Sequence, residues 1–341
     1  MGQHLPLWLS LPFLFGGLVL LGWSANRFVD GASALAKALG VSPFVVGMLI
    51  IGFGTSAPEL MVSVLSGVSD HSNLSLGNAY GSCIFNIAAI LGVAALIYPL
   101  RVRKSIAWIS SPLLFAIAAA SFFMVRDMSF SRANGFALLG LFALVMPLYC
   151  WFDRKGGAAE EAVPGENAAG PVSMARAWVF LVVGLAVLVG SSHLLVRGAV
   201  DVAKDIAGFM GFDPKRAELV IGLTVVAIGT SLPELASAIA SARKGENEFV
   251  LGNIVGSNLF NMLAVVGIAG SISPFSGYSR YIVTRDVPVM AALSISILAF
   301  GANWRDPRSA GRVGRRCGAM WLLAFAAYMA VMVYQEVHSN G

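Results

Sequence analysis

The sequence Gly-Thr-Ser-Ala-Pro-Glu at residues 54–59 returns as Gly-Thr-Ser-Leu-Pro-Glu at residues 229–234. A second motif, Gly-Asn-x-x-Gly-Ser-x-x-Phe-Asn, follows each copy, at residues 77–86 and again at 252–261. Both motifs recur at the same distance, because 229 exceeds 54 by 175 and 252 exceeds 77 by 175. The chain is therefore a duplication of two homologous units.

The composition places the chain in a membrane. It is 57% hydrophobic and 12% charged, with a mean hydropathy of +0.77, whereas charged residues make up roughly 25% of soluble domains. Its apolar runs approach the roughly 20 residues that a spanning helix needs. We therefore predict an all-α polytopic membrane protein with ten transmembrane helices. They are expected at about 6–26, 43–68, 74–99, 105–125, 133–152, 175–197, 217–242, 249–272, 282–301 and 317–335.

The two units are predicted to cross the membrane in opposite directions. Residues 1–152 would form a first five-helix repeat, 153–173 a polar linker and 174–341 a second five-helix repeat. Five is odd, so the second repeat enters the membrane inverted relative to the first, as in many secondary transporters. Lys and Arg are more numerous in the loops after the odd-numbered spans, which marks these loops as cytoplasmic. Both termini are thus expected on the extracytoplasmic side and the linker in the cytoplasm.

Each repeat is expected to carry one glutamate inside the membrane. Glu59 and Glu234 are the only acidic residues deep in a predicted span. An ionisable side chain at the bilayer centre costs about 3 kcal/mol or more, so such residues usually mark ion sites, proton relays or transport pathways. Their recurrence in an identical motif predicts an ion site where the two repeats meet.

The residues around each glutamate supply further oxygen atoms. Pro58 has no N–H, so it frees the carbonyl of Gly54 and breaks the turn that contains Thr55. Thr55 precedes Glu59 by four residues, a spacing that predicts a hydroxyl, a carboxylate and a carbonyl along one helix face. Oxygen ligands suit hard cations such as Ca²⁺ or Na⁺. Two carboxylates, one from each repeat, would balance one divalent ion.

The second motif extends this polar set. A serine and an asparagine are again four residues apart, as Ser82 with Asn86 and as Ser257 with Asn261. The asparagines near the start of each motif have two readings, helix capping or ion contact, and the glycines predict close helix packing. These residues are Asn78, Asn253, Gly77, Gly81, Gly252 and Gly256.

The two motifs, in this order and in both halves, resemble the alpha-1 and alpha-2 repeats of the cation/Ca²⁺ exchanger superfamily, over residues 52–86 and 227–261. Within it, the chain is most similar to the prokaryotic sodium/calcium exchangers. The resemblance implies a secondary transporter of the prokaryotic inner (plasma) membrane, not an enzyme, that exchanges Na⁺ for Ca²⁺ by alternating access. The first and sixth helices would slide across a rigid core. It implies contact with membrane lipid, no cofactor, no nucleic acid and no obligate protein partner.

The resemblance also assigns roles to residues. Glu59 and Glu234 would be the central Ca²⁺ ligands, completed by Thr55 and Thr230. Serines and backbone carbonyls would form flanking Na⁺ sites, and asparagines would line the middle of the site. These residues are Ser56, Ser82, Ser231, Ser257, Gly52, Ala227, Asn86 and Asn261.

The chain departs from the family pattern at one of these positions. Archaeal and potassium-dependent exchangers carry Asp where this chain has Asn261, the residue type that its own first repeat has at Asn86. A site with two carboxylates is then expected, without a requirement for potassium. The repeats also differ at Cys83 and Asn258, to which the sequence assigns no function.

Other functions remain open at this point. A proton could replace Na⁺ as the coupling ion, since a membrane-buried glutamate can carry a proton itself. A passive cation channel would need a continuous polar path, whereas only the middle cluster is polar. An antiporter for another cation is a further alternative.

Overall fold

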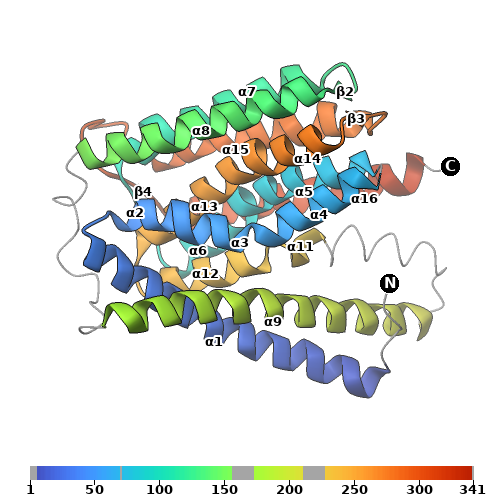
Figure 1. Cartoon of the computed structure of the whole chain (residues 1–341), viewed down its shortest axis with the longest axis horizontal. Coiled ribbons are helices and arrows are strands. Elements are labelled where there is room, and N and C mark those ends of the chain that lie inside the picture. Colours follow the sequence, from blue (N-terminus) through green and yellow to red (C-terminus); the bar gives the residue numbers. More distant parts are fainter. Residues whose placement is uncertain (1–5, 70, 156–172, 210–226, 340–341) are drawn as a thin grey trace.

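The computed structural model describes residues 6–69, 71–155, 173–209 and 227–339, and it is almost entirely helical (Figure 1). Within these ranges, eight helices are long and apolar enough to cross a membrane, or nine if the bent pair at 43–68 counts as one span. The seventh predicted span, 217–242, lies partly outside the described residues. The first-half helices are α1 Leu7–Leu39, α2 Pro43–Val46, α3 Phe53–Thr55, α4 Ala57–Val68, α5 Ser72–Phe85, α6 Gly92–Ile97, α7 Ser111–Val125 and α8 Arg132–Lys155. Those of the second half are α9 Met174–Phe209, α11 Ala227–Gly229, α12 Leu232–Arg243, α13 Asn247–Leu259, α14 Val266–Ile272, α15 Val287–Gly301 and α16 Arg315–Ser339.

Several spans are joined or extended by π-helical turns. The turn Asn86–Leu91 links α5 to α6, and Phe260–Val265 links α13 to α14, so each second motif ends where the helix widens. Among the described spans, the one formed by α13 and α14 is the most buried, which agrees with its apolar composition on all sides. π-Helical turns inside α-helices are frequent at functional sites. The other π-helical turns within the described residues are Gly47–Gly52, Ile106–Ser110 and Ile282–Asp286.

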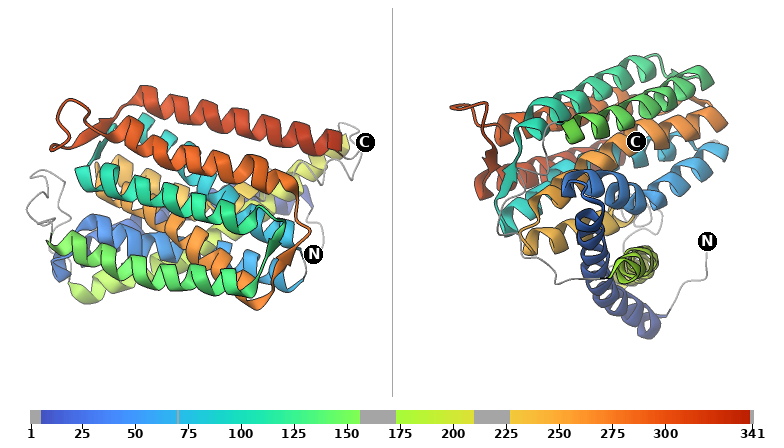
Figure 2. Two further views of the ribbon diagram at one scale, coloured as in Figure 1. Left: turned by 90° about the horizontal axis from the view of Figure 1, so that it is seen from above. Right: turned by 60° about the vertical axis from the view of Figure 1, so that its left-hand side comes forward.

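Helices α1 and α9 lie side by side along one edge of the bundle, apart from most of the other helices (Figures 1 and 2). They run well beyond the predicted spans 6–26 and 175–197, because hydropathy follows the hydrocarbon layer while a helix can continue past it. Glycines let their backbones approach closely. A Cβ atom on Gly31 would lie 2.6 Å from the backbone nitrogen of Leu181, and one on Gly198 would lie 2.6 Å from that of Leu14.

Two short antiparallel strand pairs tie the halves together. Strand β1 (Leu100–Val102) pairs with β4 (Gly311–Val313), and β2 (Ser129–Phe130) pairs with β3 (Phe275–Ser276). In each pair one strand comes from the first half and the other from the second. The pairs lie at opposite ends of the bundle (Figure 1). The two halves are therefore linked by hydrogen-bonded strands at both ends of the bundle.

The predicted linker is only partly described. Helix α8 continues to Lys155, so its last turn includes residues 153–155, which the sequence assigned to the linker. The rest of the predicted linker, 156–172, lies outside the described residues.

Candidate ion-binding site

In each copy of the first motif, the helix is interrupted at the serine that precedes the glutamate by three residues. Ser56 has φ −84° and ψ 7°, and Ser231 has φ −92° and ψ 11°, so both leave the helical conformation. The helices on either side of Ser56 meet at a bend of 44°. Glu59 and Glu234 thereby fall in the first turn of α4 and α12, and both are fully buried. The positive end of a helix dipole favours a carboxylate at this position.

The serine of each first motif contacts the glutamate of the other repeat. The hydroxyl of Ser56 donates to Oε1 of Glu234 at 3.0 Å, and that of Ser231 donates to Oε1 of Glu59 at 2.9 Å. The two contacts are equivalent under the sequence repeat. Each carboxylate is thus held partly by its own helix and partly by the other half of the chain.

The serines of the second motifs complete this cluster. Ser257 donates to Oε1 of Glu234 at 3.2 Å and lies 2.5 Å from the hydroxyl of Ser56. Ser82 lies 3.1 Å from the hydroxyl of Ser231. All four predicted serines therefore lie in one buried cluster with the two glutamates.

Asn78 and Asn253 anchor the helices that carry the glutamates. The amide of Asn78 donates to the backbone carbonyl of Glu59 at 3.1 Å, and that of Asn253 donates to the carbonyl of Glu234 at 3.3 Å. Both asparagines lie inside α5 and α13, not at their first residues, so the capping interpretation is wrong. Their side-chain oxygens are near threonine hydroxyls, at 3.4 Å from Thr230 and Thr55 respectively.

The threonines and carbonyls are arranged differently from the sequence expectation. Thr55 donates back to the carbonyl of Ile51 at 2.9 Å. Because the helix is interrupted at Ser56, Thr55 and Glu59 do not share one continuous helix face, contrary to the prediction from their spacing. The carbonyl of Gly52 accepts a bond from the backbone N–H of Ser56 at 3.2 Å. Ala227 lies in α11, two residues before the second copy of the first motif begins at Gly229.

Helix α9 packs over both first motifs. A Cβ on Gly54 would lie 2.9 Å from the Leu185 side chain, and one on Gly229 would lie 2.4 Å from that of Val196. The carbonyl of Gly229, freed by the following proline as predicted, accepts a bond from the Ser192 hydroxyl at 3.0 Å. The helix outside the core therefore touches the interrupted segments directly.

Several buried polar atoms of the site have no hydrogen-bond partner among the described residues. Such atoms are unusual in folded proteins. Glu59 and Glu234 are close enough to interact electrostatically. Asn86 and Asn261 lie in the π-helical turns that follow α5 and α13. Unpartnered carboxylate and amide oxygens in a dry interior are the ligand type that hard cations prefer. The unpartnered atoms are Oε2 of Glu59, Oε2 of Glu234, Oδ1 of Asn86, and Oδ1 and Nδ2 of Asn261.

One further acidic residue is buried inside a predicted span. Asp286, in the first turns of the span 282–301, is only 5% exposed. It accepts hydrogen bonds from Arg285 at 2.6 Å and from the Tyr328 hydroxyl at 3.0 Å. The sequence analysis considered only acids deep in a span, so it did not predict that Asp286, near the start of its span, is buried as well. The adjacent arginine gave the signal, because a neighbouring opposite charge is the usual partner of a buried carboxylate.

Three comparisons relate the chain to known proteins. The sequence model of the family described as "Sodium/calcium exchanger protein" matches residues 9–151 and 176–334. Inner membrane protein YrbG of Escherichia coli is 34% identical over 330 residues, covering 96% of this chain and 97% of YrbG. Sodium/calcium exchanger MaX1 of Methanosarcina acetivorans is 29% identical over 356 residues, covering 93% of this chain and 97% of MaX1. The solved structure of the sodium-calcium exchanger NCX_Mj, soaked with 10 mM Na⁺ and 10 mM Sr²⁺, matches with a TM-score of 0.77 and 27% identity, covering 95% of this chain and 99% of NCX_Mj.

Proposed function

The chain belongs to the sodium/calcium exchanger protein family, and on this premise we propose that it exchanges Na⁺ for Ca²⁺ across the inner membrane. It is an integral membrane protein, as its apolar helices and its named relatives agree. The proposal includes Na⁺ as the coupling ion, the residues that bind it, and a topology in which both termini lie outside the cytoplasm.

One observation carries the proposal: two fully buried carboxylates lie together, and each has an unpartnered oxygen. Glu59 and Glu234 each place Oε1 on a serine of the opposite repeat and leave Oε2 without a partner among the described residues. Two negative charges balance one Ca²⁺ ion. Burial of two carboxylates without a cation would cost free energy. The transported Ca²⁺ would supply the positive charge that balances them. The carbonyls and hydroxyls of Thr55 and Thr230 would complete its coordination.

Na⁺ would occupy neutral oxygens next to the same carboxylates. The hydroxyls of Ser56 and Ser257 flank Glu234, and those of Ser231 and Ser82 flank Glu59. A Na⁺ ion bound beside Glu59 or Glu234 would neutralise part of the negative charge that binds Ca²⁺, so the two ions would compete for the site. This competition is the basis of exchange. The carbonyls of Gly52 and Ala227, and the amides of Asn86 and Asn261, would add the remaining ligands.

Helices α1 and α9 fit the role of the moving part. Their glycine-mediated contacts bring the two backbones together, and α9 lies against both interrupted motifs. A shift of this pair along the core would cover one end of the site and uncover the other. Residues 1–152 and 174–341 would each contribute one moving helix and four core helices.

Transport by the purified protein in liposomes tests the proposal. We expect ⁴⁵Ca²⁺ uptake driven by an outward Na⁺ gradient, and none driven by an outward proton gradient at zero membrane potential. Glu59→Gln and Glu234→Gln should each abolish uptake, because each keeps the side-chain volume but removes half the charge that balances Ca²⁺. Thr284→Ala, a change outside α1, α9 and the site at an exposed hydroxyl bonded to the carbonyl of Arg280, is the control.

Each outcome decides between functions. Proton-driven uptake that ignores Na⁺ would replace this proposal with a proton-coupled exchanger. Uptake without any gradient coupling would indicate a channel. Near wild-type rates in either glutamine variant would remove that glutamate from the site.

A further inference from the structure

Asn258 connects the two repeats beside the proposed site, and its contacts fix the orientation of another amide. Its Nδ2 donates to the backbone carbonyl of Cys83 at 3.4 Å, and its Oδ1 accepts from Nδ2 of Asn86 at 3.0 Å. All three residues are completely or almost completely buried.

This chain of bonds has only one consistent direction. A backbone carbonyl can only accept a hydrogen bond, so the group of Asn258 that faces Cys83 must be its NH₂. Its oxygen therefore faces Asn86, and Asn86 must present its own NH₂ in return. The oxygen of Asn86 is left over, buried and without a partner among the described residues. An amide that could otherwise rotate by half a turn is thus held with its acceptor directed away from Asn258.

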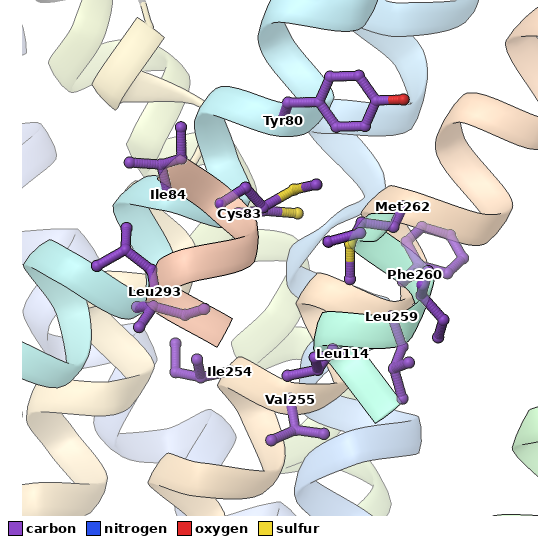
Figure 3. Packing of buried hydrophobic residues seen from close by; sticks show 14 of the residues in the cluster. Tyr80, Cys83, Ile84, Leu114, Ile254, Val255, Leu259, Phe260, Met262 and Leu293 are labelled. Atoms are coloured by element: carbon purple, nitrogen blue, oxygen red, sulfur yellow. The ribbon is translucent and has the colours of Figure 1, made fainter. Parts of the chain in front are cut away.

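The second repeat has no equivalent device. Position 83 corresponds to position 258 under the repeat, and it carries Cys83 where the second repeat carries Asn258. Cys83 lies among buried apolar residues (Figure 3), and its thiol donates a hydrogen bond to the backbone carbonyl of Asn258 at 3.8 Å. A thiol is a weak acceptor for an amide. Accordingly, both amide atoms of Asn261 lack a partner among the described residues.

We propose that Asn258 is a positioning residue that presents the amide oxygen of Asn86 to the transported ion, whereas Asn261 meets the ion without a fixed orientation. This inference rests on the proposed function and deepens it. The two asparagines, alike in sequence, then differ in role: Asn86 is a preorganised ligand, and Asn261 is an adaptable one that can turn its oxygen toward a cation or its NH₂ away from one.

A double-mutant cycle on Ca²⁺ binding tests this assignment. Ca²⁺ dissociation constants are measured calorimetrically on the purified protein in Na⁺-free detergent solution. Asn258→Ala should weaken binding roughly three- to tenfold, the range of one lost orienting hydrogen bond. In an Asn86→Ala background it should add nothing, because no amide is left to orient. In an Asn261→Ala background its full effect should persist. Cys83→Ala, the matched change at the equivalent position, should leave binding within about twofold of wild type.

The outcomes separate this inference from the function on which it depends. Equal weakening by Asn258→Ala with and without Asn86 would overturn the positioning role. A wild type that binds no Ca²⁺ would overturn the proposed function, and this inference with it. If Asn258→Ala does not fold, Asn258→Ser enters the same cycle, since a hydroxyl is too short to replace the bond to Asn86 but leaves a smaller cavity.

Discussion

Removal of the Ser231 hydroxyl should destabilise the ion-free protein more than removal of the Ser56 hydroxyl, although the two serines occupy equivalent positions. Oε1 of Glu234 accepts from both Ser56 and Ser257, at 3.0 and 3.2 Å. Oε1 of Glu59 accepts from Ser231 at 2.9 Å, while Ser82 contacts Ser231 instead. Ser56→Ala therefore leaves a hydroxyl on Glu234, whereas Ser231→Ala takes the corresponding hydroxyl from Glu59.

The size of the difference follows from these contacts. A hydrogen bond to a charged group contributes about 1.5–3 kcal/mol, and an ordinary one about 0.5–1.5 kcal/mol. We assign the larger value to Ser231→Ala and the smaller to Ser56→Ala, since the second variant retains Ser257 at the carboxylate. The two variants should then differ by about 1 kcal/mol in the free energy of unfolding, a roughly fivefold difference in the unfolded fraction.

Thermal unfolding in detergent, without Na⁺ and with a Ca²⁺ chelator, measures the order. Wild type and Thr284→Ala, a change at an exposed hydroxyl, should melt together, Ser56→Ala lower, and Ser231→Ala lowest. Saturating Ca²⁺ should reduce the difference in melting temperature between Ser231→Ala and wild type, because the bound ion then balances the charge of Glu59. Equal melting temperatures for the two site variants, or a lower one for Ser56→Ala, would refute this account of the hydrogen bonds.

Two other changes test the Na⁺ sites and the helix packing. Ser82→Ala and Ser257→Ala should each raise the Na⁺ concentration needed for half-maximal exchange while changing Ca²⁺ binding less; Ca²⁺ flux measured against Na⁺ would contradict this if all three curves coincide. Gly252→Ala should destabilise the fold by about 1–3 kcal/mol, because its Cβ would lie 2.3 Å from the carbonyl oxygen of Phe44. Gly140→Ala, where no atom of the described residues lies within 4 Å of the added Cβ, is the control in the same melting assay, and similar losses in both variants would contradict the packing argument.

The sequence predicted the parts of the fold that depend on local composition. Apolar runs located most spans within a few residues, since hydropathy directly reports the length of a helix in lipid. The close packing predicted for four glycines is confirmed at Gly252 and Gly256, because a Cβ on either would lie 2.3 Å from a backbone oxygen of the segment 43–52. At Gly77 and Gly81, by contrast, no atom of the described residues lies within 4 Å of such a Cβ. The spans 6–26 and 175–197 end before α1 and α9 do, because polar residues continue each helix beyond its apolar run.

The sequence could not predict which half completes which carboxylate. Spacing along one helix suggested that Thr55 and Glu59 act together, but spacing carries no information about the partner across an interface. The contact from Ser231 to Glu59, and that from Asn258 to Asn86, join residues about half the chain apart. Only the three-dimensional arrangement of the repeats determines them.

The serine contacts between repeats constrain how this chain arose. A single ancestral unit carried both its glutamate and its serine, yet the serine lies where it can reach only the glutamate of another copy. That unit could not have completed a carboxylate pocket alone. A unit with this arrangement needs a second copy to complete its carboxylate pocket, and the single chain supplies that copy as its other half. Because both copies belong to one chain, each can carry its own substitutions, as Cys83 against Asn258 shows.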